Sequence, residues 1–468
     1  MRVVYKIFVA VGTKQSLPAL LALLLLSGPA VGGARALLIR DARVFDGNEV
    51  LAQASVLVRD GHIAAVGPGL APPAGAEVVE GAGGTLLPGL IDAHGHVRGA
   101  GLRDELVFGV TTVLDMNTEV DWAAERRAEQ RQAAQRGEGL ERADLFSAGT
   151  LATAPGGHGS EYGPVPTVSS PAEAAPFVRA RIAEGSDYIK IVYDDNASFG
   201  RRIPTLDRST LAALVDAAHA AGKLAVVHIG SVAGAGEALA AGADGLVHLS
   251  PEAVLDAATV ALAARRGAFV VPTLSLNESL CGLPTGASLL ADERLAPYLR
   301  PYAERSLGDH FRLHPPRPLD LSFALASVAR LREAKVPILA GTDAPNPGTA
   351  HGVSIHRELE LLVRAGLSPV EALRAATSAP ARAFHLADRG RIAPGLRADL
   401  LLVDGDPTSD ITATRSLRAV WTLGRRADRE GFRRELEGPR RRRRYLVLSA
   451  AGALVIVLVV ARRRRART

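Results

Sequence analysis

The sequence has very little cysteine, since Cys281 is the single one among 468 residues. One cysteine cannot form an internal disulfide, and it cannot build a zinc site that needs several thiolates. No repeat with a period of about 20–50 residues is visible, which argues against a solenoid or a propeller. No G-x-G-x-x-G motif follows the first strand of the central α/β region, so the commonest dinucleotide-binding interpretation is removed.

The body of the chain also lacks an excess of positive charge. The 55 basic and 49 acidic residues give a net charge of +6. Two runs of arginine near the C-terminus, residues 440–444 and 462–465, contain most of that excess. A nucleic-acid surface needs basic residues gathered on the folded body, so the composition does not indicate one.

An apolar segment lies near the N-terminus. Basic residues precede the leucine-rich stretch 17–26, and small residues follow it. This is the order of a secretory signal peptide, which we predict over residues 1–36. An uncleaved anchor is the alternative.

A second apolar segment lies near the C-terminus. Residues 445–461 contain no charge and would span about 25 Å as a helix, the short limit for crossing a bilayer. Arginines bracket the segment, which argues against a buried core helix. We therefore predict a basic linker (426–444), a transmembrane helix (445–461) and a cytoplasmic tail (462–468). The folded body is expected to be exported, anchored to the cytoplasmic membrane and on its extracytoplasmic side.

Short apolar strands alternate with alanine-rich amphipathic helices over residues 88–387. Eight such strands predict an α/β fold, a (β/α)8 TIM barrel, although an open doubly wound sheet would show similar alternation. Residues 37–87 and 388–425 are β-like and are expected to form a small β-sandwich from both ends of this region. The longest irregular insertion, 275–320, is expected to be a lid or a substrate wall.

Two histidines stand one residue apart in the motif GLIDAHGHV, residues 89–97. Side chains i and i+2 of a strand point the same way, so His94 and His96 can face one point. Alone, such a pair is weak evidence for a metal. Titratable residues also occur in or at the ends of later apolar strands: Lys190, His228, His248 and Asp343. The carboxyl ends of barrel strands carry the active site, and imidazoles with a carboxylate suit zinc or a similar ion. The joint pattern therefore predicts a metal site.

The motifs around these residues resemble those of the amidohydrolase superfamily. They are GLIDAHGHV, GVTTVLDM, GSDYIKIVY, AVVHIG, AGADGLVHL, AGTDA and GRIAPGLRADLLLVDGDP. The resemblance covers residues 37–425 and points to the binuclear branch of imidazolonepropionase-like and Xaa-Pro dipeptidase-like hydrolases. It implies a hydrolase acting on carbon–nitrogen bonds with two divalent ions, for which Zn²⁺ is expected.

In that branch the strand-four lysine is carboxylated by CO2 and bridges the two metals. The implied ligands are His94, His96 and Asp343 for one ion, His228 and His248 for the other, and Lys190 between them. Because CO2 reacts only with a neutral amine, the depressed pKa of a buried lysine favours this modification. The shared water would become hydroxide near neutral pH, with Asp343 as general base and then general acid.

The sequence departs from this family pattern after His228. Dipeptidase-like relatives often have an aromatic residue or histidine just after this histidine, to contact the substrate carboxylate. The chain has Ile229, which argues against amino-acid-type substrates, and Ser231 replaces the glutamate of mononuclear deaminases. The resemblance implies that His158 contacts the substrate carbonyl, with a weaker indication for Tyr162. A loop histidine bonded to backbone is the alternative for His158.

These patterns predict a membrane-tethered binuclear metal hydrolase of amide-type C–N bonds, in cyclic amides or small peptides. An ester or lactone hydrolase on the same site is one alternative. A catalytically silent membrane-anchored binding protein is another, although all six ligand positions are filled. The expected partners are a small amide or short peptide and the membrane, with no nucleic acid; a homo-oligomer is compatible with the sequence.

Overall fold

The structure is a computed structural model that describes residues 36–438. The predicted transmembrane helix (445–461) and cytoplasmic tail (462–468) lie outside these residues. The predicted signal peptide lies outside them as well, apart from its last residue. Within residues 36–438, no helix is long and apolar enough to cross a membrane. Export and anchoring therefore stay predictions.

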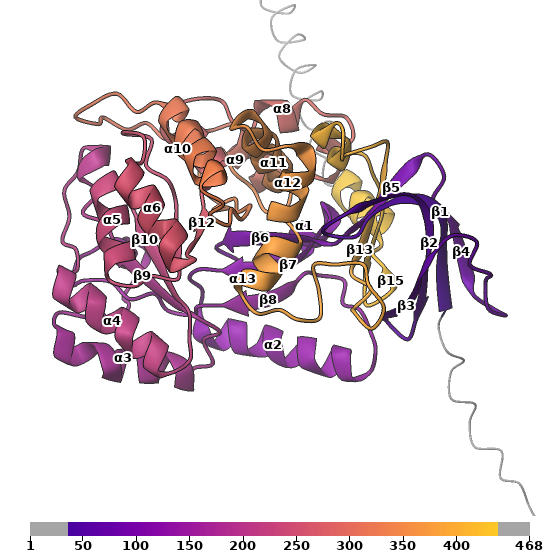
Figure 1. Cartoon of the computed structure of the whole chain (residues 1–468), viewed down its shortest axis with the longest axis horizontal. Helices are drawn as coiled ribbons and strands as arrows, with labels where there is room; N and C mark the ends of the chain where they lie inside the picture. Colours follow the sequence, from indigo (N-terminus) through magenta and orange to yellow (C-terminus); the bar gives the residue numbers. More distant parts are fainter. Residues whose placement is uncertain (1–35, 439–468) are drawn as a thin grey trace, which may run out of the picture. The chain divides into compact units, whose positions relative to one another are not determined.

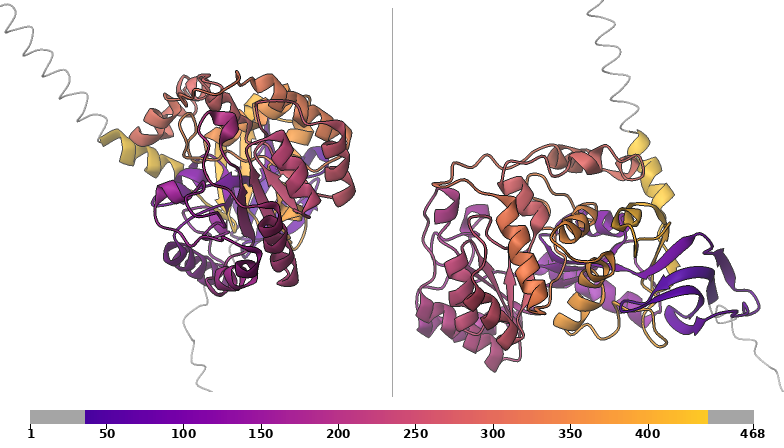
Figure 2. Two further views of the ribbon diagram at one scale, coloured as in Figure 1. Left: turned by 90° about the vertical axis from the view of Figure 1, so that its left-hand side faces the viewer. Right: turned by 45° about the horizontal axis from the view of Figure 1, so that its top comes forward.

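Both ends of the described chain join one eight-stranded sheet. Its strands are β1 (Ala36–Phe45), β2 (Val50–Arg59), β3 (His62–Gly67), β4 (Glu77–Glu80), β5 (Gly84–Pro88), β13 (Leu400–Asp404), β14 (Leu417–Thr422) and β15 (Arg425–Arg426). The order is β15-β14-β13-β5-β1-β2-β3, with β4 paired to β1. Leu86 of β5 pairs with Leu402 of β13, so the indigo and yellow segments lie side by side (Figures 1 and 2). The segments predicted to form the sandwich therefore pair within a single sheet, around a core that includes Trp421.

Seven further strands form two parallel sheets, ordered β6-β7-β8 and β12-β11-β10-β9. They are β6 (Leu90–Gly95), β7 (Val110–Asp115), β8 (Asp144–Ser147), β9 (Ile189–Tyr193), β10 (Ala225–Ile229), β11 (Gly245–Val247) and β12 (Phe269–Val271). A parallel bridge at Ala152–Ile191 joins the segment after β8 to β9. Two more, Val270–Ile338 and Gly95–Ala344, join β12 and β6 to residues 337–344, which lie between these two strands. These bridges join the segments into a closed ring, as a (β/α)8 barrel requires and an open sheet does not.

The eighth predicted strand differs from the expectation. Residues 337–344 make isolated bridges and backbone hydrogen bonds to both neighbours, but they form no regular strand. At Gly341, an added Cβ would lie 2.8 Å from the backbone nitrogen of His94. Only glycine allows this close approach, which brings the segment against β6.

Helices follow most barrel strands, and α3 to α6 lie beside strands β9 to β12 (Figure 1). The α-helices are α1 (Gly101–Val107), α2 (Val120–Gln135), α3 (Pro171–Ala183), α4 (Arg208–Ala220), α5 (Val232–Ala240), α6 (Ala257–Arg266), α7 (Leu274–Leu280), α8 (Ala287–Leu290), α9 (Pro301–Leu307), α10 (Leu321–Glu333), α11 (Ser354–Arg364), α12 (Pro369–Ala375) and α13 (Ser378–Ala383). Short 3-10 turns are η1 (Ser160–Tyr162), η2 (Ala197–Phe199), η3 (Ala296–Tyr298) and η4 (Ile411–Arg415). Asp207 and Asp256 cap α4 and α6 through their carboxylates, which fixes where these helices begin.

Two segments predicted as irregular are partly helical. The insertion 275–320 contains most of α7 together with α8 and α9. The predicted linker is helical over residues 429–438, where Phe432 and Leu436 are buried. These two residues are four apart and therefore share one helix face, which packs with residues of the insertion. The many charges of this segment cover a short apolar stripe, so it is part of the folded body up to residue 438.

Candidate metal centre

The barrel strands bring the predicted ligands to one end of the barrel. His94 is fully buried on β6, and Lys190 is 2% exposed on β9. His228 lies on β10, and His248 directly follows β11. His248 and Asp343 have backbone φ angles of 75° and 55°, in the left-handed region that side chains disfavour. Such strain persists where the surroundings fix it, and it often marks a functional site.

His94, His96 and Asp343 form a group that could bind a metal ion. The Nε2 atoms of His94 and His96 lie 3.2 and 3.0 Å from the same oxygen, Oδ1 of Asp343. Their candidate ligand atoms all lie within 4.8 Å of one another. The two histidines therefore face one point, as the i, i+2 spacing predicts, and the segment 337–344 brings the carboxylate to them.

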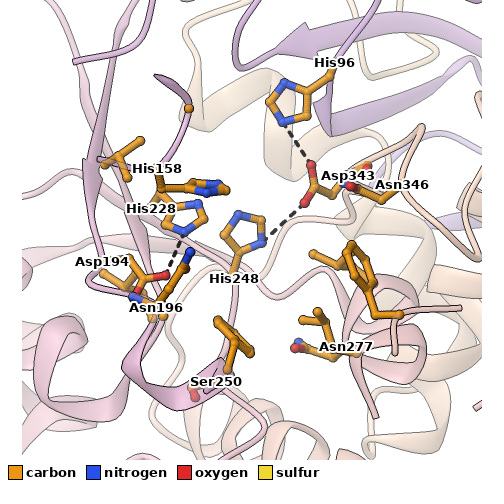
Figure 3. A pocket seen from close by; sticks show the side chains of 18 of the residues that line it. His96, His158, Asp194, Asn196, His228, His248, Ser250, Asn277, Asp343 and Asn346 are labelled. Atoms are coloured by element: carbon orange, nitrogen blue, oxygen red, sulfur yellow. Dashed lines mark hydrogen bonds and ion pairs between the residues drawn. The ribbon is translucent and has the colours of Figure 1, made fainter. Parts of the chain in front are cut away.

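His228 and His248 continue the cluster away from this group, as Figure 3 shows. The ring centroid of His248 lies 4.7 Å from that of His94 and 4.5 Å from that of His228. His248 Nδ1 is 2.9 Å from Thr273 Oγ1 and 3.9 Å from Asp343 Oδ2. The five predicted barrel side chains that carry imidazole or carboxylate thus lie in one continuous cluster.

Lys190 is buried at the same end of the barrel, and its Nζ donates no hydrogen bond to any described residue. Burial lowers the pKa of this ammonium to about 7, while Asp343 and Asp115 act in the opposite direction. A large fraction of Lys190 is therefore a neutral amine near neutral pH. An unpaired buried ammonium would be costly, so this position favours the uncharged form.

Three of the imidazoles, those of His94, His228 and His248, are also held in their neutral form. Burial lowers the pKa of His94 to about 3 and that of His228 to about 4. Burial also lowers the pKa of His248 well below its ordinary value. A neutral ring nitrogen has a lone pair for a metal, whereas an imidazolium does not.

Asp194 is a site residue that the sequence interpretation did not assign. It follows the last residue of β9, and its Oδ2 lies 3.4 Å from Nε2 of His228. Burial alone would raise the pKa of Asp194, but His228 and the backbone N–H of Asn196 lower it below the ordinary value. The carboxylate occupies the space beside Gly230, where an added Cβ would lie 2.2 Å from its Oδ1. The position of Asp194 directly after an apolar strand was the feature of the sequence that could have identified it as a site residue.

The predicted substrate residues lie on the loop after β8. His158 Nδ1 is 2.7 Å from Glu161 Oε1, and the His158 ring centroid is 4.8 Å from that of His228. The structure thus brings His158 to the histidine cluster, where it pairs with Glu161. The backbone of Tyr162 belongs to η1, but its side chain lies outside what the structure describes.

A cavity of about 530 Å³ opens over the cluster. This volume is in the range of small-molecule sites. His96, His158, Lys190, His228, His248 and Asp343 all line it. The predicted ligands therefore meet at a place that a small substrate can reach.

The comparisons with known proteins agree with this geometry. Residues 85–426 match the model of the Amidohydrolase family, so the chain belongs to this family. The predicted family resemblance is thereby confirmed. The imidazolonepropionase of Deinococcus deserti is 40% identical over 112 residues, which are 23% of this chain and 28% of that protein. The dihydroorotase of Geobacter sulfurreducens is 45% identical over 76 residues, which are 16% of this chain and 18% of that protein. The chain thus aligns with less than a third of the length of these two relatives.

Solved structures extend the likeness over most of the chain. A Xaa-Pro dipeptidase with bound methionine has a TM-score of 0.68 at 23% identity, covering 84% of this chain and 99% of that chain. A molinate hydrolase has a TM-score of 0.65 at 21% identity, covering 85% of this chain and 96% of that chain. At these identities the likeness shows the fold alone, an amidohydrolase α/β fold with an accompanying β-sheet.

Proposed function

We propose that the protein is a binuclear metal-dependent hydrolase of amide-type C–N bonds. The observation that carries the proposal is the convergence of six ligand-type side chains at one cavity. Five of them line it, namely His96, Lys190, His228, His248 and Asp343, and His94 is fully buried next to Asp343. Their donor set, imidazoles with a carboxylate, suits a divalent ion such as Zn²⁺. Family membership supports the same reaction class.

The residues present fit two metal ions. Lys190 Nζ and His94 Nδ1 are buried and make no hydrogen bond to any described residue. Buried polar atoms without partners are rare, and a bound ion explains them. His94, His96 and Asp343 would hold one ion, and His228 and His248 the other. Neutral Lys190 would attack CO2, lose a proton and become an anionic carbamate between them. Such ions would activate a water molecule for attack and would polarise the scissile carbonyl.

The protein side chains then supply positioning and proton transfer. Asp343 Oδ1 lies next to the ligand atoms of both His94 and His96, where it can take a proton and return it to the leaving amine. His158 lines the cavity beside His228 and can donate a hydrogen bond to the substrate carbonyl. Its pairing with Glu161 holds the ring in place.

The test is a metal-depletion and reloading experiment on the purified full-length protein. We expect about two zinc ions per chain by elemental analysis, and hydrolysis of a panel of N-acyl amides that chelation abolishes and Zn²⁺ restores. His94→Ala should lower the metal content and remove activity. His219→Ala is the matched control, because His219 pairs with Asp244 on the outside of the barrel. Lactone or ester hydrolysis without any amide hydrolysis would contradict the proposal, as would full metal content in His94→Ala.

A further inference from the structure

The cavity above the histidine cluster has an apolar side built by α7. Leu276 and Leu280 both line the cavity, and they are four residues apart on this helix. Residues at this spacing lie on one helix face. Asn277 lies between them in sequence and donates from its Nδ2 to the backbone oxygen of Pro272, 3.0 Å away. That bond holds the start of the helix in place, so the two leucines form a fixed surface.

The segment after α9 extends this apolar surface. Phe311 and Leu313 line the same cavity. The backbone N–H of Phe311 donates to Ser279 Oγ at 3.3 Å, and the Ser279 hydroxyl donates to the backbone oxygen of Pro347 at 2.5 Å. The insertion between barrel strands is thereby tied to α7 and to the loop that follows Asp343. We call the surface made by Leu276, Leu280, Phe311 and Leu313 the apolar wall.

The side of the cavity near His228 is acidic. Asp194 and Glu161 both line it, bonded to His228 and His158 respectively. The chain that follows His228 supplies no cation there. Ile229 and Gly230 line the cavity, and Gly230 leaves room for the Asp194 carboxylate. A substrate carboxylate placed on this side would meet two negative charges.

The basic residues that line the cavity, within residues 36–438, are Lys190 and Arg98 in addition to histidines. Lys190 lies on the floor, where the proposed carbamate would make it anionic. Arg98 is exposed at the rim, in the loop after β6, so water screens its charge. The walls of the cavity therefore offer apolar contact and hydrogen bonds but no buried cation for a carboxylate.

We propose that the site selects neutral amides that carry a bulky apolar group and discriminates against amides with a carboxylate beside the scissile bond. This inference rests on the proposed function, and it specifies the substrate class. The apolar wall binds the apolar group by burial, while Asp194 and Glu161 repel an anionic substituent. Such discrimination combines an attractive and a repulsive element at one site.

A matched pair of amides tests the proposal on the zinc-loaded full-length protein. N-phenylacetylpyrrolidine and N-phenylacetyl-L-proline share the scissile bond and the phenyl group, and they differ in one carboxylate. We expect kcat/KM to favour the neutral amide by at least about tenfold, which corresponds to about 1.4 kcal/mol. The dissociation constants of the two amides, measured by calorimetry at low temperature, should show the same preference, with tighter binding of the neutral amide.

Variants separate the two elements of the cavity. Leu280→Ala should raise KM for the neutral amide several-fold, while Leu283→Ala, at an exposed position outside the cavity lining, should leave it unchanged. Glu161→Gln loosens His158 and should lower kcat for both amides, but it also removes a negative charge and should narrow the ratio of their kcat/KM values. Arg98→Gln should leave the ratio of the kcat/KM values for the two amides unchanged.

Each outcome decides one claim. A preference for N-phenylacetyl-L-proline, above all one that Arg98→Gln removes, would overturn the inference and leave the proposed hydrolase standing. If neither amide is turned over by protein with bound zinc, nor any other amide in the panel, the proposed function fails. The ratio of the two dissociation constants then still decides the selectivity of the cavity.

Discussion

Two groups of buried charged residues in this molecule are built in opposite ways. Between the barrel and the sheet, Arg389 Nη1 and Arg397 Nη2 lie 2.9 and 2.8 Å from Asp144 Oδ2. Arg397 also pairs with Asp399 at 3.0 Å, and Asp399 accepts the backbone N–H of Leu423 at 2.8 Å. Within the part of the chain that the structure describes, these four side chains have no buried polar atom without a hydrogen bond. We call them the arginine–aspartate cluster.

The candidate metal centre is the contrasting case. It is equally buried, but Lys190 Nζ and His94 Nδ1 make no hydrogen bond to any described residue. A cluster whose charges satisfy one another is complete without a ligand, whereas unsatisfied buried groups indicate that something else belongs there. The difference teaches that burial alone does not identify a site. Unsatisfied buried atoms that also gather at one cavity do, since Glu105 and Trp421 have unsatisfied buried atoms outside any cavity described above.

The largest effect is expected at Lys190. Lys190→Ala should lower kcat by about a thousandfold or more, because the metal ions would no longer be held in place and several kcal/mol of transition-state stabilisation would be lost. A short-chain carboxylic acid in excess should restore part of the activity by taking the place of the carbamate. Lys190→Arg should be inactive, since arginine stays protonated. Lys223→Ala is the control for removal of a lysine.

The turnover and the metal content of Lys190→Ala decide this prediction. Near-normal values of both would show that the unsatisfied amine is not part of a metal centre, and would remove the contrast between the two groups.

The second effect is expected in the arginine–aspartate cluster and concerns stability instead of activity. Arg389→Ala leaves Asp144 with one fewer partner in a buried place, so the free energy of unfolding should fall by about 3–5 kcal/mol. Arg391→Ala, which removes a half-exposed pair with Asp46, should cost about 1 kcal/mol or less. Urea unfolding measures both. Equal losses would show that the closed network contributes no more than a surface pair.

Glu358 is an intermediate case that sharpens the comparison. This fully buried carboxylate accepts the backbone N–H groups of Leu274 and Ser275 at 2.9 and 2.8 Å, with no basic residue among the causes of its pKa shift. Burial raises its pKa to about 7 from 4.5. The folded state therefore holds a proton that the unfolded chain has lost, so the stability from this group falls as pH rises from 4.5 to 7.

The free energy of unfolding should change by about 3 kcal/mol over that window, and Glu358→Gln should remove this change. Unfolding free energies at several pH values, with the exposed Glu333→Gln as control, provide the measurement. An unchanged pH dependence in Glu358→Gln would mean that the carboxylate is ionised throughout.

The smallest effect is expected at Asp194, whose carboxylate contacts His228. Asp194→Asn removes the charge that orients this imidazole, so zinc affinity should fall by about tenfold. Asp195→Asn is a close control, because Asp195 bonds to the backbone of Ala197 and pairs with Arg202 instead. Zinc competition titrations compare the two. A larger loss in Asp195→Asn would show that Asp194 does not support the centre.

The sequence predicted the barrel and the six ligand-type residues because both follow from short periodic patterns. Strands β6 to β12 are apolar runs, and the titratable residues stand in or at the ends of those runs. A parallel barrel brings such ends to one face, so no knowledge of packing was needed. Whether these residues bind metal stays a prediction.

Three features could not be predicted in this way because they depend on contacts distant in sequence. Asp194 and Asp195 are adjacent acids after one strand, and only the space left by Gly230 decides that Asp194 turns toward His228. The composition of residues 429–438 predicts a charged linker, and only the packing of Phe432 against apolar residues of the insertion shows that this segment is a helix of the folded body. The segment 337–344 has strand-like composition, but its approach to β6 leaves it as isolated bridges.

The pairing of β5 with β13 has a consequence for the order of events during synthesis. Residues 84–88 leave the ribosome early, whereas residues 400–404 follow after more than 300 others. At about 5–20 residues per second, that interval lasts tens of seconds. During it, one edge of β5 exposes backbone N–H and C=O groups without their final partner. The nascent chain thus carries an open, apolar strand edge that can pair with another chain until the last strands arrive.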